Sequence, residues 1–197
     1  MHDNREAWLN AAVEKLWPLF DEVAPGPRPR VLVSTGWPSK KGTASGRRSI
    51  GQCWSRKASV DGETNHIFIS PMLGSEVDAL ETLIHELIHA QDDCEHQHKG
   101  PFVRLMRGVG LEGKPTATVA GEQLRAKLGE IAEELGEYPH KALTPNAEIK
   151  KQSTRMIKLV CHDCTDDDGK PYTVRTTRKW IEYGLPKCPN DHDLEEE

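Results

Sequence analysis

The chain has 197 residues, of which 36% are apolar and 29% charged, and its formal net charge is −5. No apolar run approaches the length of a membrane span, which excludes a transmembrane helix and predicts a protein with no membrane partner. The length suits one compact domain with a small appendage, or two small domains. The polar opening residues, MHDNREAWLN, lack the apolar core of a signal peptide, so we expect a cytoplasmic location.

Cysteine usage indicates metal binding. The chain has five cysteines, an odd number, and three of them cluster late in the sequence. This distribution favours metal sites over a disulfide framework. Cys53 and Cys94 have no partner pattern, and we interpret both as structural.

Positive charge is concentrated in the stretch 23–60, which contains eight Lys or Arg residues and no Asp or Glu. Acidic residues gather later, in QDDCE, CTDDDG and DHDLEEE. A basic stretch of this kind indicates an anionic partner such as nucleic acid, with Arg47 and Arg48 as candidate contacts. A solvated loop whose charge serves solubility explains the stretch equally well.

The first part of the chain predicts a helix followed by short strands. The helix covers residues 3–22, with Asp3 and Glu6 resembling a capping box. Three segments then have the composition of strands: 31–35, 52–60 and 65–70. The last two are joined around Asp61-Gly62, which is a hairpin signal.

The middle of the chain predicts helices and then a linker. One helix begins after Ser75, which can cap it together with Asp78, and ends at the polar stretch 92–100. Two further helices are expected, at 101–110 and at about 118–136. Residues 138–154 are polar, hold two prolines and lack periodicity, which predicts a linker. We therefore expect an α+β protein with domains over 1–137 and 155–197.

The helix after Ser75 carries the sequence His85-Glu86-Leu87-Ile88-His89. Residues four apart on a helix differ by about 40° in azimuth and 6 Å in height, so His85 and His89 can bind one ion from successive turns. Glu86 lies about 100° further round, where it can reach a metal-bound water without binding the metal. Zinc lowers the pKa of such a water, and the carboxylate can take its proton. The pattern is typical of a metalloprotease; two histidines on an ordinary helix are the alternative.

A catalytic zinc usually has three protein ligands and one open position. The candidates for the third ligand are Asp92, Asp93, Glu95, His96 and His98. On a continued helix His96 would share the face of His89 but lie about 10 Å further along, whereas His98 would face away. Either histidine requires the helix to end and the chain to turn back, for which Gly100 and Pro101 offer a place.

A second set of metal ligands lies late in the chain. VCHDC supplies Cys161 and Cys164, and KCPNDH supplies Cys188 and His192. Four such ligands form a closed, tetrahedral structural zinc site. A segment this short cannot bury enough apolar area to fold alone, so the metal must contribute stability. Two rivals to His192 as the fourth ligand are Asp191 and, less favourably, His162.

Aromatic and basic residues alternate between these two ligand pairs. Arg175, Arg178 and Lys179 are candidate nucleic-acid contacts, although a solvated basic face explains them equally well. Tyr172 and Trp180 are better explained as the few core residues of the small domain, and we expect them to be buried.

TLIHELIHAQ followed by HKGPFVRLMRGVGL resembles SprT-like metalloproteases. The resemblance covers roughly residues 5–136 by layout and is specific over about 64–110. In that family a third ligand histidine follows the motif helix, with an aromatic residue four positions later. His98 with Phe102 fits this pattern, whereas His96 is followed by Gly100. Lys99 departs from the family, in which many members have glycine at this point.

The resemblance implies a zincin-like domain followed by the zinc ribbon found in many of these proteins, and we expect an antiparallel sheet beside the motif helix. It implies two zinc ions per chain, one catalytic on His85, His89 and His98 and one structural. Glu86 is then the general base and later the proton donor to the leaving amine. Protein substrates are implied, including proteins on DNA. The alternative is a zinc-dependent nucleic-acid-binding or regulatory protein with a non-proteolytic, peptidase-like scaffold.

Overall fold

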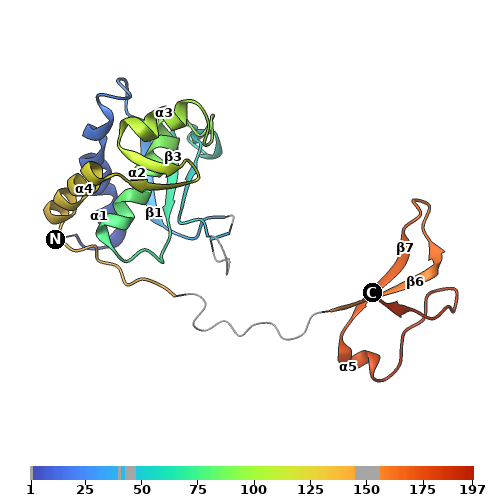
Figure 1. The fold of residues 1–197 in the computed structure, drawn as a ribbon. Helices are drawn as coiled ribbons and strands as arrows, with labels where there is room; N and C mark the ends of the chain where they lie inside the picture. Colours follow the sequence, from blue (N-terminus) through green and yellow to red (C-terminus); the bar gives the residue numbers. More distant parts are fainter. Residues whose placement is uncertain (1, 40, 43–47, 145–155) are drawn as a thin grey trace. The chain divides into compact units, whose positions relative to one another are not determined.

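The computed structural model describes residues 2–39, 41–42, 48–144 and 156–197. The chain divides into two compact units, Met1–Ala147 and Glu148–Glu197 (Figure 1). Helices and small sheets are both present, so the expected α+β class is confirmed. Among the described residues, no helix combines the length and apolar character needed to cross a membrane.

The first unit opens with α1 (Arg5–Leu16), which tightens into the 3-10 helix η1 (Trp17–Phe20). The expected capping box is wrong, because Asn4 is the N-cap and its side chain accepts a hydrogen bond from the Ala7 N–H at 2.8 Å. Glu6 instead accepts a hydrogen bond from the Thr35 N–H at 3.3 Å, which ties α1 to the first strand.

A three-stranded sheet consists of β1 (Arg30–Thr35), β2 (Gly51–Trp54) and β3 (Thr64–Ile69), in the order β1-β3-β2. β2 pairs with β3 antiparallel, but β1 pairs with β3 parallel, so the expectation of an antiparallel sheet is wrong for one of the two pairs. The chain reverses twice between β1 and β3, and the two strands therefore run the same way. β2 ends at Trp54 because Ser55 caps a short 3-10 helix, η2 (Arg56–Ala58).

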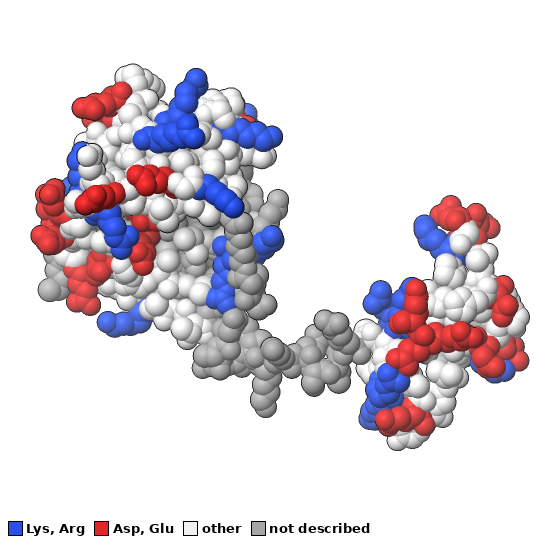
Figure 2. Space-filling model, viewed as in Figure 1, with Lys and Arg blue, Asp and Glu red and all other residues white. Residues whose placement is uncertain are grey.

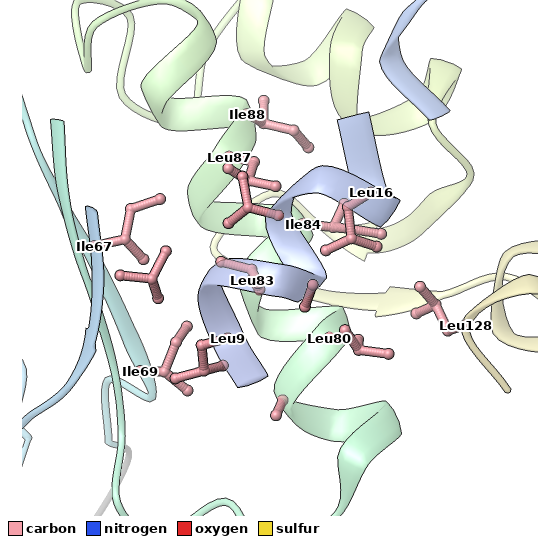
Figure 3. Packing of buried hydrophobic residues seen from close by; sticks show 14 of the residues in the cluster. Leu9, Leu16, Ile67, Ile69, Leu80, Leu83, Ile84, Leu87, Ile88 and Leu128 are labelled. Atoms are coloured by element: carbon pink, nitrogen blue, oxygen red, sulfur yellow. The ribbon is translucent and has the colours of Figure 1, made fainter. Parts of the chain in front are cut away.

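The core of the first unit is built around α2 (Glu76–Gln91). Ser75 caps this helix as expected, and its side chain accepts a hydrogen bond from the Asp78 N–H. Five large apolar side chains of α2 are fully buried: Leu80, Leu83, Ile84, Leu87 and Ile88. Figure 3 shows them between Ile67 and Ile69 of β3 on one side and Leu128 on the other. The apolar residues whose spacing predicts this helix are thus the ones that pack it into the centre of the unit.

After α2 come α3 (Pro101–Gly108), the hairpin strands β4 (Leu111–Lys114) and β5 (Ala117–Ala120), and α4 (Glu122–Leu135). A helix was expected to start at about residue 118, but this position lies inside β5. β-branched residues favour strands, and β5 contains Thr118 and Val119. Gly121 is the N-cap of α4, so the helix begins only at Glu122.

The segment 138–144 belongs to the first unit, and the expected linker of 138–154 is wrong there. Tyr138 is 2% exposed, and its ring packs on Trp8 with 4.8 Å between centroids. The Leu143 N–H donates to the Pro71 carbonyl at 2.8 Å. An extended segment that packs through single aromatic residues has no periodicity, which is why its composition resembled a linker. Residues 145–154 lie outside the described residues.

The second unit consists of β6 (Ile157–Thr165), β7 (Pro171–Thr176), α5 (Arg178–Ile181) and β8 (Glu195–Glu196). Its antiparallel sheet has the order β7-β6-β8. The core cluster of this unit contains four buried residues, Leu159, Cys161, Cys188 and Leu194. Two of the four are cysteines, so little apolar area holds this unit together.

Candidate metal centres

Three histidines of the first unit converge. His85 and His89 project from successive turns of α2, and His98 comes from the segment between α2 and α3. The Nε2 atom of His98 lies 3.2 Å from Nε2 of His85 and 3.2 Å from Nε2 of His89. Protons alone could join these three nitrogens only through one N–H shared between two acceptors, whereas a cation among them can accept a lone pair from each. This cluster is a candidate metal site.

Turns early in the 92–100 segment bring His98 to this place. Three non-glycine residues there have positive φ: Asp93 (50°), Cys94 (62°) and Gln97 (50°). The Cys94 N–H donates to the His89 carbonyl at 2.8 Å, which closes the end of α2. The sequence located a turn at Gly100 and Pro101. In the structure the chain has already reversed before these two residues. This earlier reversal was not predicted, because left-handed residues other than glycine leave no clear sequence signal.

The other candidates for the third ligand have different partners. His96 is 48% exposed and its Nδ1 lies 3.3 Å from Asp92. Asp93 accepts hydrogen bonds from the Arg56 N–H and the Asn65 side chain. Glu95 pairs with Lys57 at 3.5 Å. Of the five candidates, the structure brings only His98 among the described residues to His85 and His89.

Two residues support the histidine cluster from outside. Phe102 is fully buried, and its ring lies 4.5–5.0 Å from the centroids of all three imidazoles. Thr118 of β5 lies with Oγ1 2.9 Å from Nδ1 of His85. With Nε2 of His85 in the cluster, Nδ1 carries the proton and donates to this hydroxyl, which fixes the tautomer. Thr118 was not among the predicted site residues, because its position was expected to lie in a helix.

Burial keeps the histidines neutral, which is the form that binds metal ions. Burial, and then the neighbouring imidazoles, lower the pKa of His85 to about 4 and that of His89 to about 3. Burial also lowers the pKa of His98. At neutral pH all three ring systems therefore offer a free nitrogen.

Glu86 lies beside the cluster in a cleft of about 740 Å³ that the three histidines also line. The side chain is buried, with the residue 5% exposed, and burial raises the pKa of its carboxyl to about 8. The Cys94 thiol adds to this effect, whereas the backbone N–H of Cys53 donates to the carboxylate and opposes it. Gly51 of β2 lies so close that a Cβ there would be 2.4 Å from Glu86 Oε1. The carboxylate is thus held between α2 and the backbone of β2.

Cys53 and Cys94 are in contact, although no sequence pattern paired them. The Cys94 thiol donates to the Cys53 carbonyl oxygen at 3.6 Å, and the Cys53 thiol donates to the Trp54 carbonyl oxygen at 3.7 Å. Interaction between the two neighbouring thiols raises the pKa of Cys53 and lowers the pKa of Cys94. Both residues line the cleft that contains Glu86.

The second unit brings together the four expected ligands, Cys161, Cys164, Cys188 and His192. Cys164 Sγ lies 3.6 Å from Cys188 Sγ and 3.3 Å from Nδ1 of His192. The rivals lie elsewhere: Asp191 is an exposed partner of Lys187, and His162 is an exposed partner of Glu195. The group is a second candidate metal site.

Backbone N–H groups surround the sulfur of Cys188. The N–H groups of Asn190 and His192 each donate to Cys188 Sγ at 3.3 Å. Although burial opposes the effect, these donors lower the pKa of the Cys188 thiol to about 7. The loop therefore favours the thiolate, which is the form that binds metals.

Four of the eight basic residues in the stretch 23–60 form ion pairs with acids. These pairs are Arg28–Asp21, Arg30–Glu63, Arg56–Asp93 and Lys57–Glu95. Figure 2 shows positive and negative side chains interspersed on the face of the first unit that is in view. Arg48 lines the cleft and donates to Met72 Sδ at 3.0 Å, whereas Arg47 lies outside the described residues. These pairs weaken the case for a continuous basic surface on the first unit.

The second unit presents its aromatic residues to solvent, so the expectation that Tyr172 and Trp180 form its core is wrong. Tyr172 is 38% exposed, Trp180 60% and Tyr183 80%. The interior is filled by Leu159, Leu194 and the cysteines instead.

The three basic candidates of the second unit differ in their surroundings. Lys179 Nζ lies 5.5 Å from the Trp180 ring, and Arg175 is exposed. Arg178 makes two hydrogen bonds to Glu196, at 2.9 and 2.6 Å. Arg175 and Lys179 are therefore better placed to meet an anion than Arg178.

Comparison with protein-family models, curated proteins and solved structures gives no match for this chain. The residues and geometry of the two clusters are therefore the basis for the function proposed next.

Proposed function

We propose that the chain is a zinc-dependent endopeptidase, with a zincin-like catalytic unit and a zinc ribbon. The observation that carries the proposal is the position of Glu86, a buried carboxylate in the same cleft as three converging histidines. A purely structural metal site has no use for such a neighbour, and burying a carboxylate with only a backbone hydrogen bond from Cys53 is costly. The resemblance of the surrounding sequence to SprT-like metalloproteases supports the same class.

The donor sets and distances suit zinc. In a tetrahedral site with Zn–N bonds of about 2.0–2.1 Å, ligand nitrogens lie about 3.3 Å apart. The two distances from His98 Nε2 are both 3.2 Å. Three cysteines and one histidine in the second unit are a common structural zinc set. We therefore assign His85, His89 and His98 to a catalytic zinc, and Cys161, Cys164, Cys188 and His192 to a structural zinc.

A bound zinc supplies a water of lowered pKa and polarises the carbonyl of the peptide bond. The charge of a bound zinc would favour the ionised form of Glu86, which can then accept the proton of the attacking water and pass it to the leaving amine. The Cys53 N–H orients the carboxylate through a backbone hydrogen bond. Thr118 holds His85 in the tautomer with Nε2 directed into the cluster.

The cleft also has a place for an extended peptide. β2 is at the edge of its sheet, and Gly51, Gln52 and Cys53 line the cleft. Within the described residues, no strand pairs with the outer edge of β2. A substrate segment can add to such an edge through main-chain hydrogen bonds, which favours unfolded or extended protein substrates.

The decisive experiment compares wild type with Glu86→Gln on an unfolded protein substrate, with and without DNA. Loss of a general base costs roughly 100- to 10,000-fold in rate, so we expect activity to fall by that factor while zinc content stays unchanged. Glu95→Gln is a matched control, because it makes the same chemical change at an exposed position three residues before His98. If wild type and Glu86→Gln are equally inactive in all conditions, the non-proteolytic scaffold is the better description.

We also propose that the second unit binds nucleic acid, so that DNA-bound proteins are candidate substrates. Exposed Trp180 and Tyr183 can stack on bases, and Arg175 and Lys179 can meet phosphates. The double variant Arg175→Glu/Lys179→Glu should then lower both DNA affinity and the salt dependence of binding. Hydrolysis of a short unstructured peptide should be unchanged.

Lys170→Glu, in the turn between β6 and β7, is the control for a general change in charge. Anisotropy titrations at several salt concentrations measure both quantities. Wild-type protein that binds neither single- nor double-stranded DNA at low salt would leave recognition of the substrate to protein contacts alone.

A further inference from the structure

Cys53 and Cys94 are the cysteines that the metal sites do not use. They are 41 residues apart in the chain, and the fold brings them together from β2 and from the segment between α2 and α3. All three remaining cysteines belong to the candidate metal site of the second unit. The pair therefore needs an explanation of its own.

The backbone holds Cys94 in an unfavourable conformation to make this contact. Its φ is 62°, in the left-handed region that is unfavourable for residues other than glycine. Glycine or asparagine would occupy such a position at lower cost. In this conformation the thiol donates to the Cys53 carbonyl oxygen at 3.6 Å, which places it beside the Cys53 side chain.

The thiol pair is also accessible to small molecules. Cys53 and Cys94 are both half-buried, and both line the cleft of about 740 Å³. Structural cysteines are usually sealed inside a core, where they are inert. Here a small oxidant that enters the cleft reaches both sulfurs.

We propose that Cys53 and Cys94 are a redox-active dithiol that closes reversibly to a disulfide in the wall of the cleft. The oxidant is a hydroperoxide. One thiolate attacks the peroxide, the O–O bond breaks, the sulfur becomes a sulfenic acid, and an alcohol or water leaves with a proton. The second thiol attacks that sulfur, the S–O bond breaks, and water leaves. The two sulfurs lose two electrons and the peroxide gains them.

The disulfide changes the neighbourhood of Glu86. Closing an S–S bond of about 2.05 Å draws β2 and the 92–98 segment together. β2 carries the Cys53 N–H that donates to Glu86, and the 92–98 segment ends at His98. Oxidation should therefore lower hydrolysis reversibly, an effect that rests on the proposed peptidase function. Formation of the disulfide itself does not depend on that function.

The test uses the full, zinc-loaded chain, treated at low protein concentration with hydrogen peroxide and then digested with trypsin without reduction. Cys53 lies in the peptide 49–56 and Cys94 in the peptide 58–99, and neither contains another cysteine. We expect these two peptides to appear cross-linked, with a mass two hydrogens below their sum. A dithiol reductant should restore the separate peptides and, if the peptidase proposal holds, the activity.

The proposal is overturned if both peptides keep free thiols, or if each cysteine oxidises on to sulfinic or sulfonic acid without a cross-link. Cys53→Ser and Cys94→Ser supply a second measurement. In each variant the remaining cysteine should stop at a sulfenic acid that dimedone traps, and peroxide should no longer lower the activity through a dithiol-reversible step. A disulfide that forms without changing hydrolysis would leave the modification site in place and remove only its effect on Glu86.

Discussion

At the scale of single residues, the first candidate metal centre shows which contacts a sequence can reveal. The helical spacing of His85 and His89 predicts their shared direction, because a regular helix fixes the position of every residue. His98 was reached only through a family resemblance, since its position depends on three left-handed residues between α2 and α3. The contact of Thr118 with His85 was not predicted at all. A single hydroxyl that contacts a ligand 33 residues away has no local pattern.

Thr118 gives a prediction at this scale. Thr118→Val keeps the shape of the side chain but removes the hydroxyl that fixes the His85 tautomer. Loss of such an outer partner typically weakens metal binding 10- to 100-fold, so we expect zinc at the first site to be held about 10-fold more weakly. A competition titration with a chromophoric chelator measures the affinity. Thr116→Val, two residues earlier in the β4–β5 turn, serves as the comparison, and equal effects of the two changes would contradict the assignment.

At the scale of elements, α2 and β2 approach each other more closely than their sequences suggest. The apolar periodicity of α2 predicts a buried helix, and the pairing of β2 with β3 follows from the turn signal at Asp61-Gly62. The distance between the helix and the outer strand depends on one residue without a side chain. Gly51 allows the backbone of β2 to touch the carboxylate of Glu86.

Gly51→Ala should therefore reduce hydrolysis. The added Cβ would be 2.4 Å from Glu86 Oε1 and 2.8 Å from Thr82 Cγ2, so the carboxylate or the strand must move. A displacement of about 1 Å in a catalytic group can cost on the order of 100-fold in rate, which is the loss we expect in kcat/KM. The melting temperature should change less than the rate.

Gly129→Ala is the matched control for this change. Gly129 lies within α4, and a Cβ there meets nothing within 4 Å. Alanine in a helix interior is more stable than glycine by roughly 0.5–1 kcal/mol, so this variant should melt slightly later and keep full activity. Equal activity of the two variants would show that β2 does not restrain Glu86.

At the scale of the whole molecule, the two units are stabilised in different ways. The first has a continuous core from α1 to Tyr138, with α2 at its centre. The second has a core cluster of four buried residues among those described, and two of them are candidate metal ligands. Composition could predict this contrast, because a Cys/His framework in a short segment implies dependence on metal. It could not predict that the aromatic residues of the second unit face solvent.

Metal removal should therefore unfold one unit and spare the other. After treatment with a strong chelator, amide resonances of residues 156–197 should collapse to unfolded positions, while those of the α2 core stay dispersed. Protein reloaded with zinc should contain two ions per chain by elemental analysis. A second unit that stays folded without metal, or a stoichiometry of one, would contradict the assignment of two zinc sites.

The packing of Tyr138 against Trp8 sets the smallest fragment that can carry the first candidate metal centre. Besides this ring contact, the Tyr138 N–H donates to Glu76 in the first turn of α2, and Trp8 Nε1 donates to the Gly136 carbonyl. Tyr138 thus closes α1 onto the start of the helix that presents His85 and His89. The end of α4 suggests a domain boundary at residue 137. A truncated protein that ends there would expose the Trp8 ring to water and lose the Tyr138 contacts with Trp8 and Glu76. Dissection of the two units by limited proteolysis or by shortened genes should therefore retain the chain through residue 144.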